Sequence, residues 1–236
     1  MRASPPAPSQ LYVDAAAASS LGPRHPRLAP GELHVWVADL SPVDDSTCRL
    51  LDDAELERAR RIVGERERIA WQRSRASLRQ LLARYLGVGE RFLQLDAGAG
   101  GKPMLRSERA PYFNLSHSGD VAVYALAMYP VGVDVEVMRR ADAARRRDHA
   151  ALARRAFGLP VAERLTGLDE DTQEREFLRH WTRHEAALKL AGGGIGATVD
   201  RAPADPWIAE LDLGSTIVAA VASARPADTL RVWRLA

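Results

Sequence analysis

The sequence has little of several features that mark common protein classes. It contains a single cysteine, Cys48, among 236 residues, which excludes an intramolecular disulfide framework and a zinc site built from several cysteines. No apolar run approaches the ~18 residues that span a bilayer, and the N-terminus lacks the charged and then apolar pattern of a secretory signal. We therefore expect a soluble cytoplasmic protein without a membrane partner.

An excess of charge of one sign is also lacking. The 33 Lys and Arg residues nearly balance 31 Asp and Glu residues, for a formal charge of +2, so the whole-chain charge does not indicate a nucleic-acid-binding protein. What the chain does have is a hydrophobic content of 46%, which is enough for a core. Its length suits one large domain or two of roughly 100 residues each.

Composition and periodicity divide the chain into an N-terminal extension and a folded part. Residues 1–30 are rich in Pro, Ala and Ser with little apolar periodicity, which predicts a flexible extension. Polar and apolar residues alternate over 32–37, which predicts the first strand. Residues 52–86 carry leucines at helical spacing, so we expect one or two helices there, with Gly87 as the C-cap.

The remaining elements are mixed in type. Strands are predicted at 121–127, 131–137 and within 211–235, and a helix at 174–191, which three glycines follow. The strands are largely antiparallel in character, which predicts an α+β fold.

A weak internal repeat relates two helical segments. Residues 71–79 and 181–189 align without gaps, with Trp, Ala and Leu matched and Arg79 matched by Lys189. Chance similarity between two helices rich in Ala, Leu and Arg is one explanation. The other is two similar α+β halves, 31–129 and 130–236, related by a pseudo-twofold axis, with a cleft between them that holds the active site.

Two acids share one face of a predicted strand. In the segment 131–137 the valines occupy one face, while Asp134 and Glu136 lie on the other, about 7 Å apart. One interpretation is a half-buried strand with its acidic face in water. The other is a magnesium site, because hard cations prefer oxygen ligands and neighbouring like charges repel unless a cation joins them.

The helix at 181–189 offers a second set of reactive groups. Steps of four align Trp181, Glu185 and Lys189 on one side. They could be a core aromatic residue and an exposed ion pair. In a functional site, Glu185 could bind a metal or accept a proton, while Lys189 and His184 could hold phosphate oxygens.

Further polar groups lie in the segment 114–119, which we interpret as a turn that could bind an anion. Ser116, His117 and Asp134 have the residue types of a hydrolase triad, but Ser116 lacks the Gly-x-Ser-x-Gly context of the nucleophile elbow. Arginines crowd residues 58–79, and Lys102 follows a glycine-rich turn. Most are expected to be solvated and ion-paired, although some could bind phosphates.

Four of these segments, taken in order, resemble the motif set of the Sfp-type 4′-phosphopantetheinyl transferases. They are Gly101-Lys102-Pro103, Phe113 to Ser118, Val131 to Glu136, and Trp181-x-x-His184-Glu185-Ala186-x-x-Lys189. The resemblance extends from about residue 32 to the C-terminus and implies the family's fold of two similar α+β halves. It also implies transfer of 4′-phosphopantetheine from coenzyme A to a serine of an apo acyl or peptidyl carrier protein, releasing adenosine 3′,5′-bisphosphate.

The resemblance assigns roles to individual residues. Asp134, Glu136 and Glu185 look like the magnesium-binding acids, and Glu185 also looks like the base that deprotonates the carrier serine. Lys189 looks like a pyrophosphate-binding and catalytic residue, and His117 is a second catalytic candidate. The coenzyme A contacts that the resemblance implies are Arg75, Lys102, Ser116, His117, His184 and Lys189.

One residue departs from the family pattern. The family commonly has lysine immediately before the helix glutamate, where this chain has His184. Because the unperturbed pKa of histidine is ≈ 6.5, its charge near neutral pH is conditional. We expect a retained site with altered phosphate affinity or pH dependence.

The resemblance also implies a monomer built as a pseudo-dimer, and it favours carriers of polyketide or nonribosomal peptide biosynthesis. Two alternatives belong to other classes. A non-catalytic homologue would bind coenzyme A or a carrier protein without transfer. A basic nucleic-acid-binding module would show salt-sensitive affinity and be indifferent to replacement of Asp134.

Overall fold

The computed structural model describes residues 11–14, 20–41, 49–98, 103–105, 110–138, 148–192 and 205–235. The fold is mixed α+β, as predicted. The helices are α1 (Asp53–Arg60), α2 (Glu65–Leu86), the 3₁₀ helix η3 (Glu90–Phe92), α3 (His149–Phe157), α4 (Leu159–Leu165) and α5 (Glu170–Leu190). The strands are β1 (Leu11–Asp14), β2 (Glu32–Asp39), β3 (Leu95–Ala97), β4 (Pro103–Leu105), β5 (Tyr112–Ser118), β6 (Val121–Ala127), β7 (Val131–Val137), β8 (Trp207–Asp212), β9 (Ile217–Ser223) and β10 (Thr229–Arg234).

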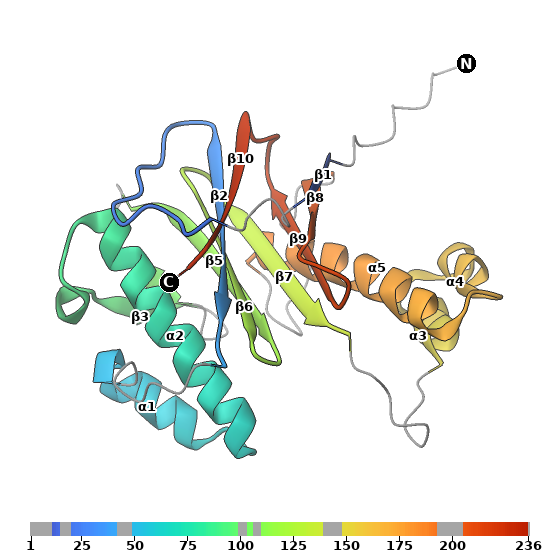
Figure 1. The fold of residues 1–236 in the computed structure, drawn as a ribbon, viewed down its shortest axis with the longest axis horizontal. Helices are drawn as coiled ribbons and strands as arrows, with labels where there is room; N and C mark the ends of the chain where they lie inside the picture. Colours follow the sequence, from blue (N-terminus) through green and yellow to red (C-terminus); the bar gives the residue numbers. More distant parts are fainter. Residues whose placement is uncertain are drawn as a thin grey trace.

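Two four-stranded sheets form the centre of the molecule (Figure 1). The first sheet has the order β10-β2-β6-β5, and the second has the order β1-β8-β9-β7. In each sheet the strand that precedes a long helix, β2 or β7, pairs antiparallel with the second strand of the hairpin that follows the helix, β6 or β9. The same strand–helix–hairpin unit therefore occurs twice along the chain.

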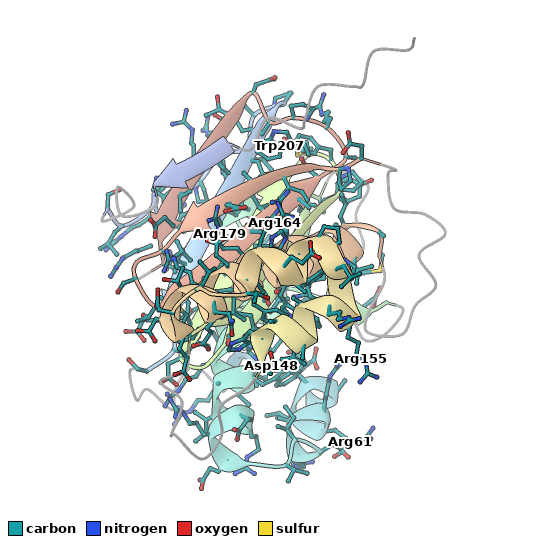
Figure 2. The ribbon with its side chains drawn as sticks, turned by 90° about the vertical axis from the view of Figure 1, so that its right-hand side faces the viewer. Arg61, Asp148, Arg155, Arg164, Arg179 and Trp207 are labelled. Carbon is teal, nitrogen blue, oxygen red and sulfur yellow. The ribbon has the colours of Figure 1, made fainter. Side chains whose placement is uncertain are left out.

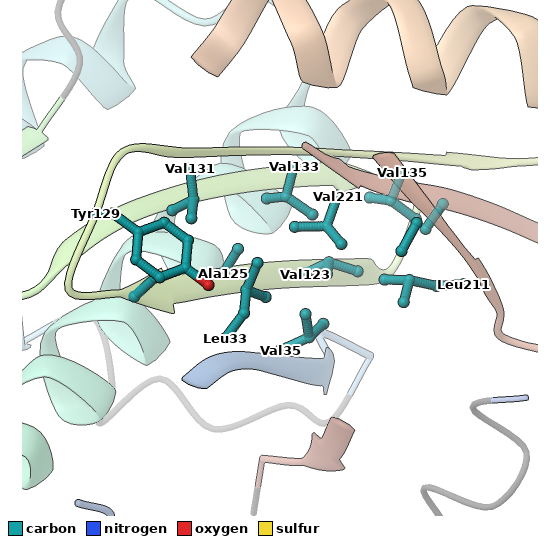
Figure 3. Close-up of a cluster of buried hydrophobic side chains, with 13 residues drawn as sticks. Leu33, Val35, Val123, Ala125, Tyr129, Val131, Val133, Val135, Leu211 and Val221 are labelled. Carbon is teal, nitrogen blue, oxygen red and sulfur yellow. The ribbon is translucent and has the colours of Figure 1, made fainter. Parts of the chain in front are cut away.

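Apolar side chains of the two sheets pack against one another (Figure 3). Leu33 and Val35 of β2 belong to the same buried cluster as Val133 of β7, and all three side chains are fully buried. Removing a side chain of this size from water stabilises the fold by roughly 1.5–3 kcal/mol. Val131, Val133 and Val135 therefore face the core between the sheets, which turns Asp134 and Glu136 toward the opposite face of the second sheet.

The long helices cover the outer faces of the sheets, α2 on the first and α5 on the second (Figure 1). Helix α2 packs leucines such as Leu78 and Leu82 against Trp36 and Tyr124. It ends at Gly87, whose φ of 65° lies in the left-handed region, so the predicted C-cap is confirmed. In the part of the chain that the structure describes, no helix is long and apolar enough to cross a membrane.

The ends of the chain depart from the sequence prediction. The sequence predicts ordered structure from residue 32, with 1–30 as a flexible extension, but β1 pairs in parallel with β8 at the edge of the second sheet. Residues near 21 also bond to the C-terminal strand, where the Gly22 amide donates to the Arg234 carbonyl. The first ten residues and 15–19 lie outside the described residues.

The proposed boundary at 129/130 separates β2–β6 from β7–β9, but the terminal strands cross it. Strand β10 pairs in parallel with β2 in the first sheet, while β1 completes the second. The first sheet thus includes a strand from the C-terminal end of the chain, and the second sheet includes one from the N-terminal end. The reason is that the outer edges of β2 and β8 offer unpaired backbone groups, which an added strand satisfies.

Gly132 lets α5 approach β7 closely. A Cβ atom at this position would lie 2.1 Å from the Ala186 carbonyl oxygen and 2.5 Å from the Leu190 amide nitrogen. We expect Gly132→Ala to lower the free energy of unfolding by about 1–3 kcal/mol in urea titrations, because helix backbone must move. Gly89→Ala is the matched control, since its Cβ would meet only the exposed Phe92 ring at 3.3 Å. Equal midpoints for the two variants would contradict this packing.

Candidate functional site

Helix α5 presents different side chains to the three strands beneath it. Its central row lies over β9 and is buried: Thr182, Ala186 and Leu190. On one side, Arg183 donates to Glu210 of β8 at 3.4 Å. On the other side, Lys189 reaches Asp134 of β7. The helix therefore places a lysine above the acids of the strand 131–137.

Lys189, Asp134 and Ser116 form a compact hydrogen-bonded group. The Lys189 Nζ atom lies 2.6 Å from Asp134 Oδ1 and 2.9 Å from Ser116 Oγ. The Ser116 hydroxyl in turn donates to Asp134 Oδ1 over 2.8 Å. Three elements that are far apart in sequence, β5, β7 and α5, thus meet at one carboxylate oxygen.

The Asp134 carboxylate is buried, since the residue is only 4% exposed. Its second oxygen, Oδ2, accepts no hydrogen bond from the described part of the chain. A buried carboxylate needs a cation or hydrogen bonds, because desolvation penalises the charged form. Here Lys189 and Ser116 stabilise Oδ1, while Oδ2 can still accept a hydrogen bond or bind a cation.

Glu136 lies two residues further along β7 and is held by the neighbouring strand. The Ser118 hydroxyl donates to Glu136 Oε2 at 2.8 Å and accepts a hydrogen bond from the Val137 amide at 3.2 Å. Ser118 therefore donates a hydrogen bond to Glu136, as Ser116 donates one to Asp134. The two serines of β5 orient the two acids of β7.

The segment 114–119 is mostly strand, so its interpretation as a turn is wrong. Asn114, Ser116 and Ser118 lie in β5, and the turn follows at Gly119, whose φ is 55°. The alternate residues face β7, as shown by the hydrogen bond from the Val133 amide to Asn114 Oδ1 at 3.0 Å. These polar side chains join the two sheets along β5 and β7, where a run of Asn and Ser had suggested a turn.

His117 belongs to the other face of β5. Burial lowers the pKa of His117 below its usual value, and the charge of Lys189 lowers it further, so the imidazole is neutral at pH 7. Its Nε2 atom is buried and has no hydrogen-bond partner among the described residues. Because Ser116 bonds to Asp134 and successive residues of a strand face opposite ways, the hydrolase triad is not formed.

The carboxylate oxygens of Asp134 and Glu136 are of the kind that a hard divalent cation prefers. Asp134 Oδ2 is a buried oxygen available to such an ion, and Glu136 lies on the same face of β7. Within the described ranges, however, no three His, Cys, Asp or Glu side chains are gathered closely enough to hold a metal. Asp134 and Glu136 thus fit a cation, whereas the set of three acids with Glu185 stays a prediction.

Glu185 and His184 lie on different sides of α5. Glu185 is half-buried and lies one helical turn before Lys189, so both project toward the same side. His184 is exposed and packs edge-on against Phe157 of α3, with ring centroids 5.8 Å apart. The structure therefore groups Glu185 with Lys189, and it places His184 against α3.

Arg75 is part of a separate buried network. Its Nε donates to Glu55 Oε1 at 3.0 Å, and Arg79 Nε donates to Glu55 Oε2 at 2.6 Å. Burial lowers the pKa of the Arg75 guanidinium, against the opposing effect of Glu55. The predicted role of Arg75 toward coenzyme A stays a prediction, and Lys102 lies outside the described residues.

The roles of Ser118, Asn114 and Glu55 are not among those predicted from the sequence. The two-residue period of polar side chains over 114–118, opposite the apolar Phe113 and Leu115, was a signal for a strand with one polar face. Glu55 carried no comparable signal, because glutamate in an arginine-rich helical region is usually solvated.

Comparison with known proteins places this site within a family. Residues 130–218, which contain β7, α5 and the β8–β9 connection, match the model of the 4′-phosphopantetheinyl transferase superfamily. Asp134, Glu136, Glu185 and Lys189 all lie within the matched segment.

Proteins that are similar to this chain over most of its length belong to the same family. The 4′-phosphopantetheinyl transferase HetI of Nostoc sp. is 34% identical over 73% of this chain and 75% of its own length. The 4′-phosphopantetheinyl transferase psf-1 of Bacillus pumilus is 29% identical over 69% and 70%, respectively. The L-aminoadipate-semialdehyde dehydrogenase-phosphopantetheinyl transferase of Pongo abelii is 31% identical over 70% of this chain and 56% of its own. The chain therefore belongs to the 4′-phosphopantetheinyl transferase superfamily.

Proposed function

We propose that this protein transfers 4′-phosphopantetheine from coenzyme A to a serine of an apo carrier protein and releases adenosine 3′,5′-bisphosphate. The observation that carries the proposal is the meeting of Asp134, Ser116 and Lys189 at one buried carboxylate, within the fold that matches the family. Such a group can hold both a cation and phosphate oxygens, which phosphoryl transfer requires.

Asp134 and Glu136 are the residues that would hold magnesium, with Glu185 as the third proposed acid. Oxygen ligands favour Mg²⁺ among common metals, and the orphaned Asp134 Oδ2 supports this assignment. When bound, the ion supplies neutralisation of the charge that develops on the pyrophosphate. Ser116 and Ser118 donate hydrogen bonds to the two acids and so orient the carboxylates that would receive the ion.

The chain's own residues position the reacting groups. Glu185 accepts the proton of the carrier serine, whose oxygen attacks the β-phosphorus and forms the new phosphoester bond. The pyrophosphate bond breaks, and adenosine 3′,5′-bisphosphate departs with the electron pair. Lys189 offers an ammonium to the pyrophosphate, while neutral His117, on the opposite face of β5, is proposed to donate a hydrogen bond to another part of coenzyme A.

The proposed phosphate contacts follow from the side chains that the site already engages. Ser116 already bonds to Asp134 and Lys189, so its proposed part is to orient them as well as to meet coenzyme A. His184 packs on Phe157, which leaves Lys189, His117, Lys102 and Arg75 as the proposed contacts. With these contacts, phosphate binding would not require a lysine at the position of His184.

A carrier protein would find a basic and partly apolar surface on α3 and α4, which pack against the side of α5 that carries His184. Figure 2 looks onto the helices of this half, where Arg155 and Arg164 lie on α3 and α4. Both arginines are exposed, and Leu152 and Leu159 are 39% and 51% exposed on the same helices. An acidic helix on a carrier protein would complement such a surface.

We further propose that the two strand–helix–hairpin units form a pseudo-twofold pair in a monomer, with coenzyme A bound in a cleft along β5 and β7. The repeated strand order and the side-chain bonds between these strands support this placement. A cytoplasmic location and a carrier of secondary metabolism complete the proposal. The relatives named above give no support to a non-catalytic homologue.

Intact-mass spectrometry tests the proposed function. An apo carrier protein incubated with the enzyme, coenzyme A and Mg²⁺ should gain about 340 Da, the mass of a phosphopantetheine unit. The gain should vanish with EDTA and with Glu185→Gln, which removes the proposed base. No gain with acyl and peptidyl carriers, despite measured binding of coenzyme A, would favour the non-catalytic homologue.

A further inference from the structure

Lys189 neutralises Asp134, which is also the buried acid that would hold a metal ion. Its ammonium lies 2.6 Å from Asp134 Oδ1, and the Ser116 hydroxyl fixes both groups at 2.9 and 2.8 Å. The Asp134 side chain is 6% exposed, so its charge depends on this partner when no other cation is bound. The lysine side chain is 26% exposed, which leaves it a route away from the carboxylate.

Two cations therefore compete for one buried carboxylate. A divalent ion at Asp134 would lie within a few ångströms of the ammonium, and like charges at that distance repel strongly in a poorly solvated site. The phosphates of coenzyme A offer Lys189 an alternative partner of opposite charge. The metal and coenzyme A should consequently favour each other's binding beyond the effect of their direct contact.

We propose that Lys189 is the resting counter-ion of Asp134 and that the metal and coenzyme A bind together because the phosphates draw the lysine away. This inference rests on the proposed function, since it takes coenzyme A as the ligand. Linkage makes the effect reciprocal, so the metal raises the affinity for coenzyme A by the same factor. Lys189 thus controls metal binding at the acidic site and also contacts the pyrophosphate.

Removing the lysine should open the acidic site to metal without coenzyme A. We expect Lys189→Met to bind Mn²⁺ at least about fivefold more tightly than the wild type, measured at pH 8 by the electron paramagnetic resonance signal of free Mn²⁺. The further gain on adding coenzyme A should be smaller in Lys189→Met than in the wild type. Equal Mn²⁺ affinity in the two proteins without coenzyme A would overturn the proposal.

Arg183→Met is the matched control for loss of one positive charge. Arg183 lies on the same helix but pairs with Glu210 of β8, so its removal should leave Mn²⁺ affinity close to that of the wild type. Equal gains in the Arg183 and Lys189 variants would mean that net charge alone governs metal binding, which also overturns the proposal.

The wild-type protein allows a second test that does not depend on a variant. The chain contains two lysines, Lys102 and Lys189, so protein labelled with ¹³C-lysine gives two assignable side-chain signals. Mg²⁺ alone should move the Lys189 signal little, whereas Mg²⁺ with coenzyme A should shift it. An unchanged Lys189 signal at coenzyme A saturation would refute the displacement, while failure of coenzyme A to bind by calorimetry would refute the proposed function instead.

Discussion

Replacing Asp134 with asparagine is expected to lower the rate of phosphopantetheine transfer by about 10²–10³-fold, because one preorganised charge at the reacting pyrophosphate is lost. The carboxamide keeps the size of the side chain and an oxygen for Ser116, so the fold should survive. It cannot supply the negative charge that holds Lys189 at Oδ1 and that a divalent cation would need at Oδ2. Single-turnover transfer to an apo carrier protein, followed by mass spectrometry, measures the loss.

The control for this variant is Asp212→Asn in the same sheet. Asp212 lies in β8 and pairs with Arg175 at 3.6 Å, two strands away from Asp134 of β7. Its replacement should change the transfer rate by no more than about threefold, as expected of a partly exposed ion pair. If both variants transferred at the wild-type rate, Asp134 would be a structural partner of Lys189 and no more.

Replacing Glu55 with glutamine is expected to lower the free energy of unfolding by about 3–5 kcal/mol, because two buried arginines lose their carboxylate. Glu55 is 6% exposed, while Arg75 and Arg79 are 9% and 3% exposed. Arg79 keeps partners in Asp52 and the Leu93 carbonyl, but Arg75 keeps mainly the ring of Trp71, 5.6 Å from its guanidinium carbon. Urea unfolding followed by circular dichroism measures the change.

Glu57→Gln offers the same substitution two residues further along the same helix. The Glu57 side chain is 50% exposed and pairs with Arg60 and Arg61, which are 74% and 76% exposed. Solvent screens these pairs, so the variant should unfold at nearly the same urea concentration as the wild type. In Glu55→Gln the new amide oxygen can still serve the capping box with Asp52, and the comparison therefore isolates the buried charge. A Glu55 variant as stable as the Glu57 variant would contradict the buried network.

The two helices of the internal repeat carry different ion pairs at equivalent positions. Arg75 and Arg79 of α2 align with Glu185 and Lys189 of α5, and both helices lie on the outer face of a sheet (Figure 1). In α2 the aligned cations bind the carboxylate of Glu55 from the preceding helix. In α5 the lysine binds the aspartate of the strand beneath. Equivalent positions thus carry a structural ion pair in one unit and the acidic site in the other.

Much of the architecture could be predicted because it depends on short-range periodicity. The helices α2 and α5, the glycine that ends α2, and the strands β2, β6 and β7 all follow from the spacing of apolar residues. The two acids of β7 were placed on one face for the same reason. The family resemblance rested on these motifs and is confirmed by the comparisons.

Other features depended on which distant segments meet, and local patterns do not encode that. Apolar spacing alone predicts the α+β class, the acidic face of β7 and the side of α5 that carries Glu185 and Lys189. The folded chain adds that β1 joins the second sheet and β10 the first, that Ser116 and Ser118 hold the acids, and that Lys189 is the cation on Asp134. The physical reason is that strand edges and buried charges select their partners by proximity in the folded chain, where one lysine lies close enough to replace lost solvation.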